Sequence, residues 1–364
     1  MVTTRQRRTL ASIVLLIALC AGVATGVVIS GSIDGADADA GPASARRFLA
    51  RYVAPDGRVV RRDQGSDVVS EGQAYAMLIS QAVGDRDTFE RVWGWTRTHL
   101  QRPDGLLSSR WAGGAIVDRQ PAADADLDAA HALVLAGRRF GRPALTHAGL
   151  RIAKAILARE TLTTALGPVL VAGPWAVRTR VVNPSYFSPA AFQELGRTTR
   201  DSRWSYLEFT SYRIVDQLTA KGAQIPPDWA MVDGRGNATP RPAPGGATER
   251  FGFEALRVPI RMAASGTAYG RGLAARTWHF FSGVQPDRLD QLYTLDGRPL
   301  AVGQHAAMLA AGATAGAAAG ESARGEGLRA RAAVVDRSHQ TYYGAAWLAL
   351  SDLVVGAHLA DGPV

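Results

Sequence analysis

The stretch SEGQAYAMLISQAV, residues 70–83, carries the pattern that decides the fold class. Tyr75, Leu78, Ile79 and Ala82 recur at i, i+3, i+4 and i+7, which is the spacing of one face of an α-helix. Similar patterns recur along most of the chain, so we expect a protein built almost entirely from amphipathic helices.

A carboxylate opens this helix. Ser70 is a good N-cap, and Glu71 would then lie in the first turn, where the helix dipole favours a negative charge. Capping alone does not account for Gly72 and Gln73, which are poor choices for a purely structural first turn. They would allow close approach of a ligand and hydrogen bonding to it, so Glu71 is a candidate catalytic acid.

The remaining chain repeats this helical pattern between long loops. Helices are predicted near residues 87–100, 124–139, 143–159, 188–196, 203–220, 253–264, 270–281, 303–319 and 340–357. Segments 164–173 and 176–183 could form a short hairpin, and the Ala/Gly-rich stretch 306–333 is partly of low complexity. No fixed-period repeat is visible, which favours a closed helical barrel or toroid over a regular solenoid.

Composition narrows the possible functions. The chain has 364 residues, of which 47% are hydrophobic and 20% charged, and its formal charge is +9. The basic charge would suit an anionic partner, but no zinc knuckle, basic amphipathic run or phosphate loop is present, so nucleic acid is not expected. Cys20 is the single cysteine, which excludes a disulfide framework within the chain. No cofactor or metal is predicted.

The N-terminus resembles a targeting segment. Arg5, Arg7 and Arg8 precede 25 uncharged residues that end before Asp34. A basic flank before such a run places the N-terminus on the cytoplasmic side of the membrane and the rest of the chain on the outer side. Residues 1–33 are therefore interpreted as a signal peptide or, preferably, a signal anchor. Residues 34–44 are interpreted as a linker and 45–364 as an exported catalytic domain, secreted or held at the outer side of the cytoplasmic membrane.

Further acids lie near other predicted helix starts. Asp124, Asp126 and Asp128 alternate, and Asp124, Asp128 and His131 share one helix face. The alternation also resembles a calcium loop, but the glycine and closing glutamate of an EF-hand are missing. Glu254 lies three residues before Arg257 in FGFEALRVPIR, residues 251–261, a spacing that would equally suit a surface ion pair.

Aromatic residues accompany these acids. Trp111, Trp175, Tyr186 and Tyr343 lie in the motifs SSRW, GPWAV, NPSYFSP and TYYG. The apolar faces of sugar rings stack on exposed aromatic rings, although most aromatic residues in globular proteins belong to the core. Carboxylates with aromatic neighbours therefore suggest a polysaccharide-binding site.

In combination these motifs resemble glycoside hydrolase family 8. SEGQAYAM (70–77), ADADLDAAHALVLAGRRFG (123–141), NPSYFSPAAFQEL (183–195), FGFEALRVPIR (251–261) and TYYGAAWLAL (341–350) occur in the family's order, so the resemblance covers about residues 45–357. The family contains bacterial endo-β-1,4-glucanases, chitosanases, lichenases and xylanases. The resemblance implies an all-α (α/α)6 barrel with long loops that form a substrate cleft, and an inverting mechanism.

The resemblance also assigns roles. It implies that Glu71 is the general acid and that Asp124, with Asp126 beside it, holds sugar at the cleavage point. Glu254 stands where the family usually has an aspartate as general base, and Arg257 is the matching arginine. Trp111, Trp175, Tyr186 and Tyr343 are expected to contact substrate. Because Glu254 departs from the pattern, the alternatives are a base elsewhere or a polysaccharide-binding protein without turnover; a chitosanase or xylanase is the alternative enzyme. A monomer is expected.

Overall fold

The computed structural model describes residues 40–356. The predicted targeting segment, residues 1–33, and Cys20 lie outside this part of the chain. Helix α2 (Ala40–Tyr52) already begins at Ala40, so the folded domain takes up the end of the stretch interpreted as a linker. Between residues 40 and 356 no helix is both long and apolar enough to cross a membrane.

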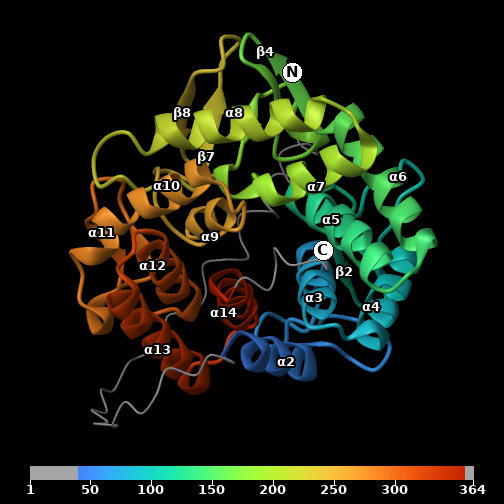
Figure 1. Ribbon diagram of the computed structural model, residues 1–364, viewed down its shortest axis with the longest axis horizontal. Helices are drawn as coiled ribbons and strands as arrows, with labels where there is room; N and C mark the ends of the chain where they lie inside the picture. The colour runs from blue at the N-terminus through green and yellow to red at the C-terminus, as the bar shows by residue number, and fades with distance from the viewer. Residues whose placement is uncertain (1–39, 357–364) are drawn as a thin grey trace.

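The helices form an (α/α)6 barrel, which confirms the predicted fold class (Figure 1). The inner ring consists of α3 (Ser70–Ala82), α5 (Ala123–Arg139), α7 (Pro189–Thr199), α9 (Arg257–Ala263), α12 (Ala306–Ala318) and α14 (Tyr342–Val355). The outer ring consists of α2, α4 (Arg86–His99), α6 (Pro143–Arg159), α8 (Arg203–Leu218), α10 (Ala268–Arg276) with the short α11 (Trp278–Ser282), and α13 (Ser322–Ser338).

Side-chain character decides which ring a helix joins. The inner helices α5, α12 and α14 are buried over nearly every residue, and alanines dominate α12. Outer helices such as α4 and α6 bury one face only and expose charged residues on the other. A helix that is apolar all round must be enclosed, whereas an amphipathic helix covers a core from outside.

Inner and outer helices alternate, so all long connections fall at one end of the barrel. Connections from an inner helix to the next outer one are short, such as residues 83–85, 140–142 and 200–202. Connections from an outer helix to the next inner one hold every described strand and are longer, except for residues 339–341 between α13 and α14. The N-termini of the inner helices therefore share the end that carries the loops predicted to be functional.

The strands form small antiparallel sheets within these loops. Their bounds are β1 (Val68–Val69), β2 (Arg110–Ala112), β3 (Ala115–Asp118), β4 (Thr161–Thr164), β5 (Gly167–Leu170), β6 (Val181–Val182), β7 (Trp229–Val232), β8 (Ala238–Arg241), β9 (Leu292–Tyr293) and β10 (Pro299–Ala301). The predicted hairpin between 164–173 and 176–183 is wrong in its partners, because β5 pairs with β4 and β6 pairs with β7. Because only a short turn separates β4 from β5, β4 is a nearer partner for β5 than β6 is.

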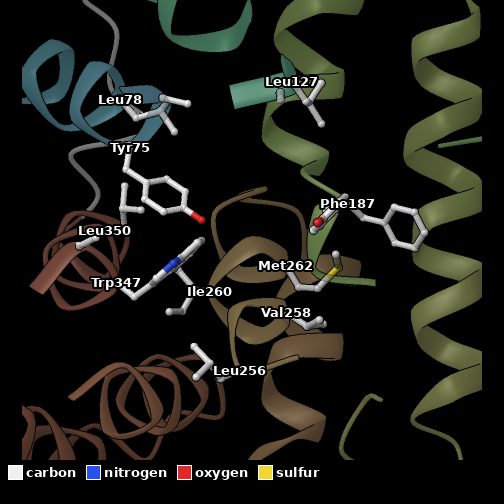
Figure 2. Packing of buried hydrophobic residues seen from close by; sticks show 14 of the residues in the cluster. Tyr75, Leu78, Leu127, Phe187, Leu256, Val258, Ile260, Met262, Trp347 and Leu350 are labelled. Atoms are coloured by element: carbon white, nitrogen blue, oxygen red, sulfur yellow. The ribbon is translucent and has the colours of Figure 1, made fainter. Parts of the chain in front are cut away.

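The core fills the space between the inner helices (Figure 2). Tyr75 of α3 and Trp347 of α14 meet there with their ring centroids 5.2 Å apart and nearly perpendicular. Ile260 of α9 is almost fully buried beside Trp347, and Met262, which is fully buried, lies farther from the two rings (Figure 2). This apolar layer lies below the loop-bearing end and supports the polar groups described next.

Candidate active site

The N-terminal turns of several inner helices bring the predicted catalytic residues together. Glu71 is the second residue of α3, Asp124 the second of α5, and Glu254 lies in the turn that leads into α9. Arg257, the first residue of α9, contacts both Asp124 and Glu254. Positions 133 residues apart in the sequence are therefore joined in one cluster.

Glu71 has the environment of a proton donor. Its side chain is partly exposed, and the Ser70 hydroxyl donates to Oε2 at 3.1 Å. Burial, followed by the nearby negative charge of Asp124, raises the pKa of Glu71 to about 7 from an ordinary 4.5. The expectation that Ser70 caps the helix is wrong: Val69 is the N-cap, and Ser70 is already helical. The Ser70 hydroxyl is therefore free to bind Glu71 instead of the helix end.

The residues that follow Glu71 have structural roles. Gln73 is fully buried; its Oε1 accepts from the backbone N–H of Val59 at 2.5 Å, and its Nε2 donates to the Thr96 hydroxyl at 2.8 Å. At Gly72 a Cβ atom would lie 2.5 Å from the hydroxyl of Tyr342. The expectation that Gly72 and Gln73 serve a ligand is therefore wrong, because they admit Tyr342 and hold the loop before β1.

Asp124 and Glu254 share one arginine. Arg257 donates through Nη1 to Asp124 Oδ2 at 2.7 Å and to the Tyr75 hydroxyl at 3.1 Å, and through Nη2 to Glu254 Oε2. The Arg257 and Glu254 side chains are 3% and 19% exposed, so their ion pair lies largely in the interior and is not the surface pair that the spacing of these two residues allowed. Burial raises the pKa of Asp124 to about 6, and Arg257 opposes that rise.

Glu254 is held at its carboxylate and at its backbone. Asn183 Nδ2 donates to Glu254 Oε2 at 2.9 Å, and 19% of the Glu254 side chain stays exposed. The Glu254 backbone N–H donates to Asp228 Oδ1 at 3.2 Å, and Asp228 is nearly fully buried. Burial raises the pKa of Glu254, whereas Arg257 and Asn183 lower it by stabilising the charged form. A carboxylate fixed by two donors but still open to water can act as a general base.

The four predicted aromatic contacts occupy different depths. Trp111 and Trp175 are partly exposed, on β2 and on the 3-10 helix Pro174–Ala176 respectively. Tyr186 is 8% exposed, and the Arg257 guanidinium lies 5.3 Å from its ring centroid. Tyr343 is partly exposed and donates its hydroxyl to the Phe253 carbonyl. Tyr186 and Tyr343 thus adjoin the Arg257 cluster, whereas Trp111 and Trp175 lie in loops at the same end.

The aspartates after Asp124 turn away from this cluster. Asp128 forms a two-pronged ion pair with Arg261, with N–O distances of 2.5 and 2.6 Å, and it is almost fully buried. Asp126 is fully buried and accepts the Leu107 backbone N–H at 2.7 Å. Its predicted contact with substrate does not fit this position, because residues two apart on a helix point in nearly opposite directions and Asp126 therefore does not share the face of Asp124. No described group of three or more His, Cys, Asp or Glu residues is arranged to hold a metal ion.

Comparison with known proteins agrees with this constellation. The family model described as "Glycosyl hydrolases family 8" matches residues 32–357. The chain belongs to this family. It is 34% identical over 242 residues to a probable endoglucanase of Novacetimonas hansenii, an alignment that covers 63% of this chain and 70% of that protein. It is 28% identical to an endoglucanase of Cellulomonas uda, with 59% of this chain and 61% of the relative covered.

Solved structures support the family assignment. An endo-β-1,4-glucanase from Acetobacter xylinum superimposes with a TM-score of 0.74 at 26% identity, covering 89% of this chain and 100% of that one. The family 8 chain described here is therefore a glycosyl hydrolase of the endoglucanase type.

Two site residues escaped the sequence reading. Asn183 lay within the quoted motif NPSYFSP but was not singled out, and Asp228, which holds the Glu254 turn, precedes β7 without any motif.

A cavity of about 950 Å³ lies at the other end of the barrel, between His131, Arg138 and Glu194, and none of Glu71, Asp124 or Glu254 lines it. The cleft expected at the carboxylate end stays a prediction.

Proposed function

We propose that this protein is an exported endo-β-1,4-glucanase that acts with inversion at the anomeric carbon. The observation that carries the proposal is the difference in partners: no cation bonds to Glu71 among the described residues, and its pKa is raised to about 7, whereas at Glu254 two donors oppose the rise in pKa that burial causes. One carboxyl group that keeps its proton and a second that can lose it are the pair that an inverting glycosidase needs. Export is supported by the basic flank and apolar run of residues 1–33.

The proposed steps follow from these positions. Glu71 gives its proton to the glycosidic oxygen as the bond to the anomeric carbon breaks. Glu254 takes a proton from a water that attacks the same carbon from the opposite face. Asp124, held by Arg257 between the two, accepts hydrogen bonds from the sugar hydroxyls. Trp111 and Trp175 provide apolar surfaces for sugar rings further along the polysaccharide.

Substitution of either acid tests the mechanism. We expect Glu71→Gln and Glu254→Gln each to lower kcat on carboxymethyl cellulose by about 10²–10⁴-fold, the usual worth of a positioned acid or base. Glu249→Gln is the matched control, because Glu249 is an exposed glutamate in the loop that leads to Glu254. Proton NMR of the first product should show the α anomer; a β product would overturn the inverting mechanism.

The substrate and the alternative function need separate readouts. A panel of cellulosic, mixed-linkage, xylan and chitosan polymers with reducing-end detection identifies the preferred linkage, and viscometry shows whether cleavage is internal. The alternative, a polysaccharide-binding protein without turnover, is motivated by Glu254, which stands where the family resemblance leads us to expect the shorter aspartate. That alternative is correct if the wild type is no faster than either glutamine variant on every polymer while it still binds one of them. Fractionation of cells that express the full chain tests export.

A further inference from the structure

A second acidic pair lies behind the site, between α5 and the end of α6. Asp126 and Glu160 are both fully buried, and Glu160 directly follows the last residue of α6. Their side chains are within hydrogen-bonding reach of each other. Asp126 Oδ1 accepts the Leu107 N–H, but Asp126 Oδ2 and both carboxyl oxygens of Glu160 have no hydrogen-bond donor among the residues that the structure describes.

Nothing nearby neutralises two charges. Within residues 40–356 no Lys, Arg or His nitrogen forms an ion pair with either carboxyl group. The facing charges on neighbouring elements are Asp124 on α5 and Asp104 and Arg102 in the loop after α4. Arg102 is already committed to Asp104 at 2.9 Å and to the carbonyl of Arg119. Two bare carboxylates in such a place would be strongly destabilising.

We propose that Asp126 and Glu160 share a proton and together act as a positioning pair for the active site. A proton between the two groups supplies the missing donor, since carboxylates alone can only accept. Burial first, and then neighbouring negative charges, raises the pKa of both groups well above their ordinary values, which agrees with a retained proton. The pair thus fixes α5 to the end of α6 and to Leu107.

The consequence for the site lies in what the pair holds. Leu107 begins the segment that leads to Trp111 on β2, and Asp126 is two residues beyond Asp124 at the start of α5. The contact between Asp126 and Glu160 therefore fixes the position of the Trp111 hairpin, formed by β2 and β3, relative to α5, which carries Asp124. Asp126 and Glu160 do not touch substrate in this arrangement.

The first test uses Glu160→Gln, whose amide can donate to Asp126 as the shared proton does. The infrared difference spectrum at pH 7, in which the spectrum of this variant is subtracted from that of the wild type, should show a protonated carboxyl band that the variant lacks. We expect the unfolding midpoint of Glu160→Gln at pH 8 to equal or exceed that of the wild type. Asp128→Asn is the matched control: it is a buried aspartate with an arginine partner, so its midpoint should fall.

A second variant makes the outcome decisive. Glu160→Leu fills similar space without a donor, so it should loosen Leu107 and raise KM, by about tenfold or more if the Trp111 hairpin shifts, while Glu160→Gln keeps kcat/KM within about twofold. The kinetic readout rests on the proposed function, but the infrared and unfolding readouts do not. If the difference spectrum has no protonated carboxyl band, or if Glu160→Gln is as unstable as Asp128→Asn, the shared proton is refuted. If Glu160→Gln does not fold, the same spectrum is recorded on Asp126→Asn.

Discussion

Replacing Glu71 by glutamine should have opposite effects on activity and on stability. The pKa of Glu71 is raised from 4.5 to about 7, first by burial and then by Asp124. In the unfolded chain the group loses its proton near its ordinary pKa, whereas in the folded protein it keeps it to a higher pH. The unfolded state therefore binds fewer protons in this window, and the stability of the wild type falls as the pH rises from 4.5 to 7.

The magnitude follows from this window. Each pKa unit corresponds to about 1.4 kcal/mol, so a rise from 4.5 to about 7 costs the folded wild type about 3 kcal/mol at pH 8. Glu71→Gln has nothing to titrate, and its amide can still accept from the Ser70 hydroxyl. We expect the variant to match the wild type in stability near pH 4.5 and to be more stable at pH 8, while its kcat falls by about 10²–10⁴-fold.

The assay is denaturant unfolding at several pH values, combined with initial rates on the same preparations. Glu249→Gln, at an exposed site, should show the same pH dependence of stability and the same initial rate as the wild type. In the wild type, kcat/KM should fall above pH 7 as Glu71 loses its proton. Parallel stability curves for wild type and Glu71→Gln would refute the raised pKa, and a rate that stays constant through pH 8 would refute the role as acid.

Two further predictions concern the residues behind Glu71. Gln73→Leu should lower the free energy of unfolding by about 2–4 kcal/mol in denaturant titration, because the backbone N–H of Val59 and the hydroxyl of Thr96 lose a buried partner; an unchanged midpoint would contradict this role. Gly72→Ala should cost about 1–3 kcal/mol through its close contact with the Tyr342 hydroxyl. Because that hydroxyl has no hydrogen-bond partner within residues 40–356, Tyr342→Phe should restore part of the loss, and absence of any recovery in the double variant would contradict the steric explanation.

The helical periodicity predicted most of the barrel, because enclosed helices carry a pattern that survives in the sequence. Helix α5, expected at 124–139, spans Ala123–Arg139, and α6 spans Pro143–Arg159, the range expected for it. Helix α13, Ser322–Ser338, was not predicted, since its alanines, glycines and arginines form no clear apolar stripe. The packing of α13 against its neighbours, and not its intrinsic pattern, makes it a helix.

The start of α9 shows a different limit. A continuous helix was expected from 253, but the helix begins at Arg257, and Glu254 lies in a turn before it. Asp228 causes the difference: its Oδ1 accepts the backbone N–H groups of Gly252, Glu254 and Ala255, and so stabilises the turn. No local signal could reveal a partner that comes from a distant loop.

The difference in pKa between Asp124 and Glu71 depends on how helix α5 packs against helix α9. Asp124 and Asp128 are one turn apart on α5, and they meet Arg257 and Arg261, one turn apart on α9. The sequence shows both spacings, but only the packing of α5 against α9 pairs them. Glu71 lies near Asp124 and has no arginine within bonding distance among the described residues, so its pKa rises to about 7, whereas Arg257 limits the rise at Asp124 to about 6. The arginine that α9 supplies to Asp124, and that Glu71 lacks, therefore helps to separate the proton donor from the carboxylate beside it.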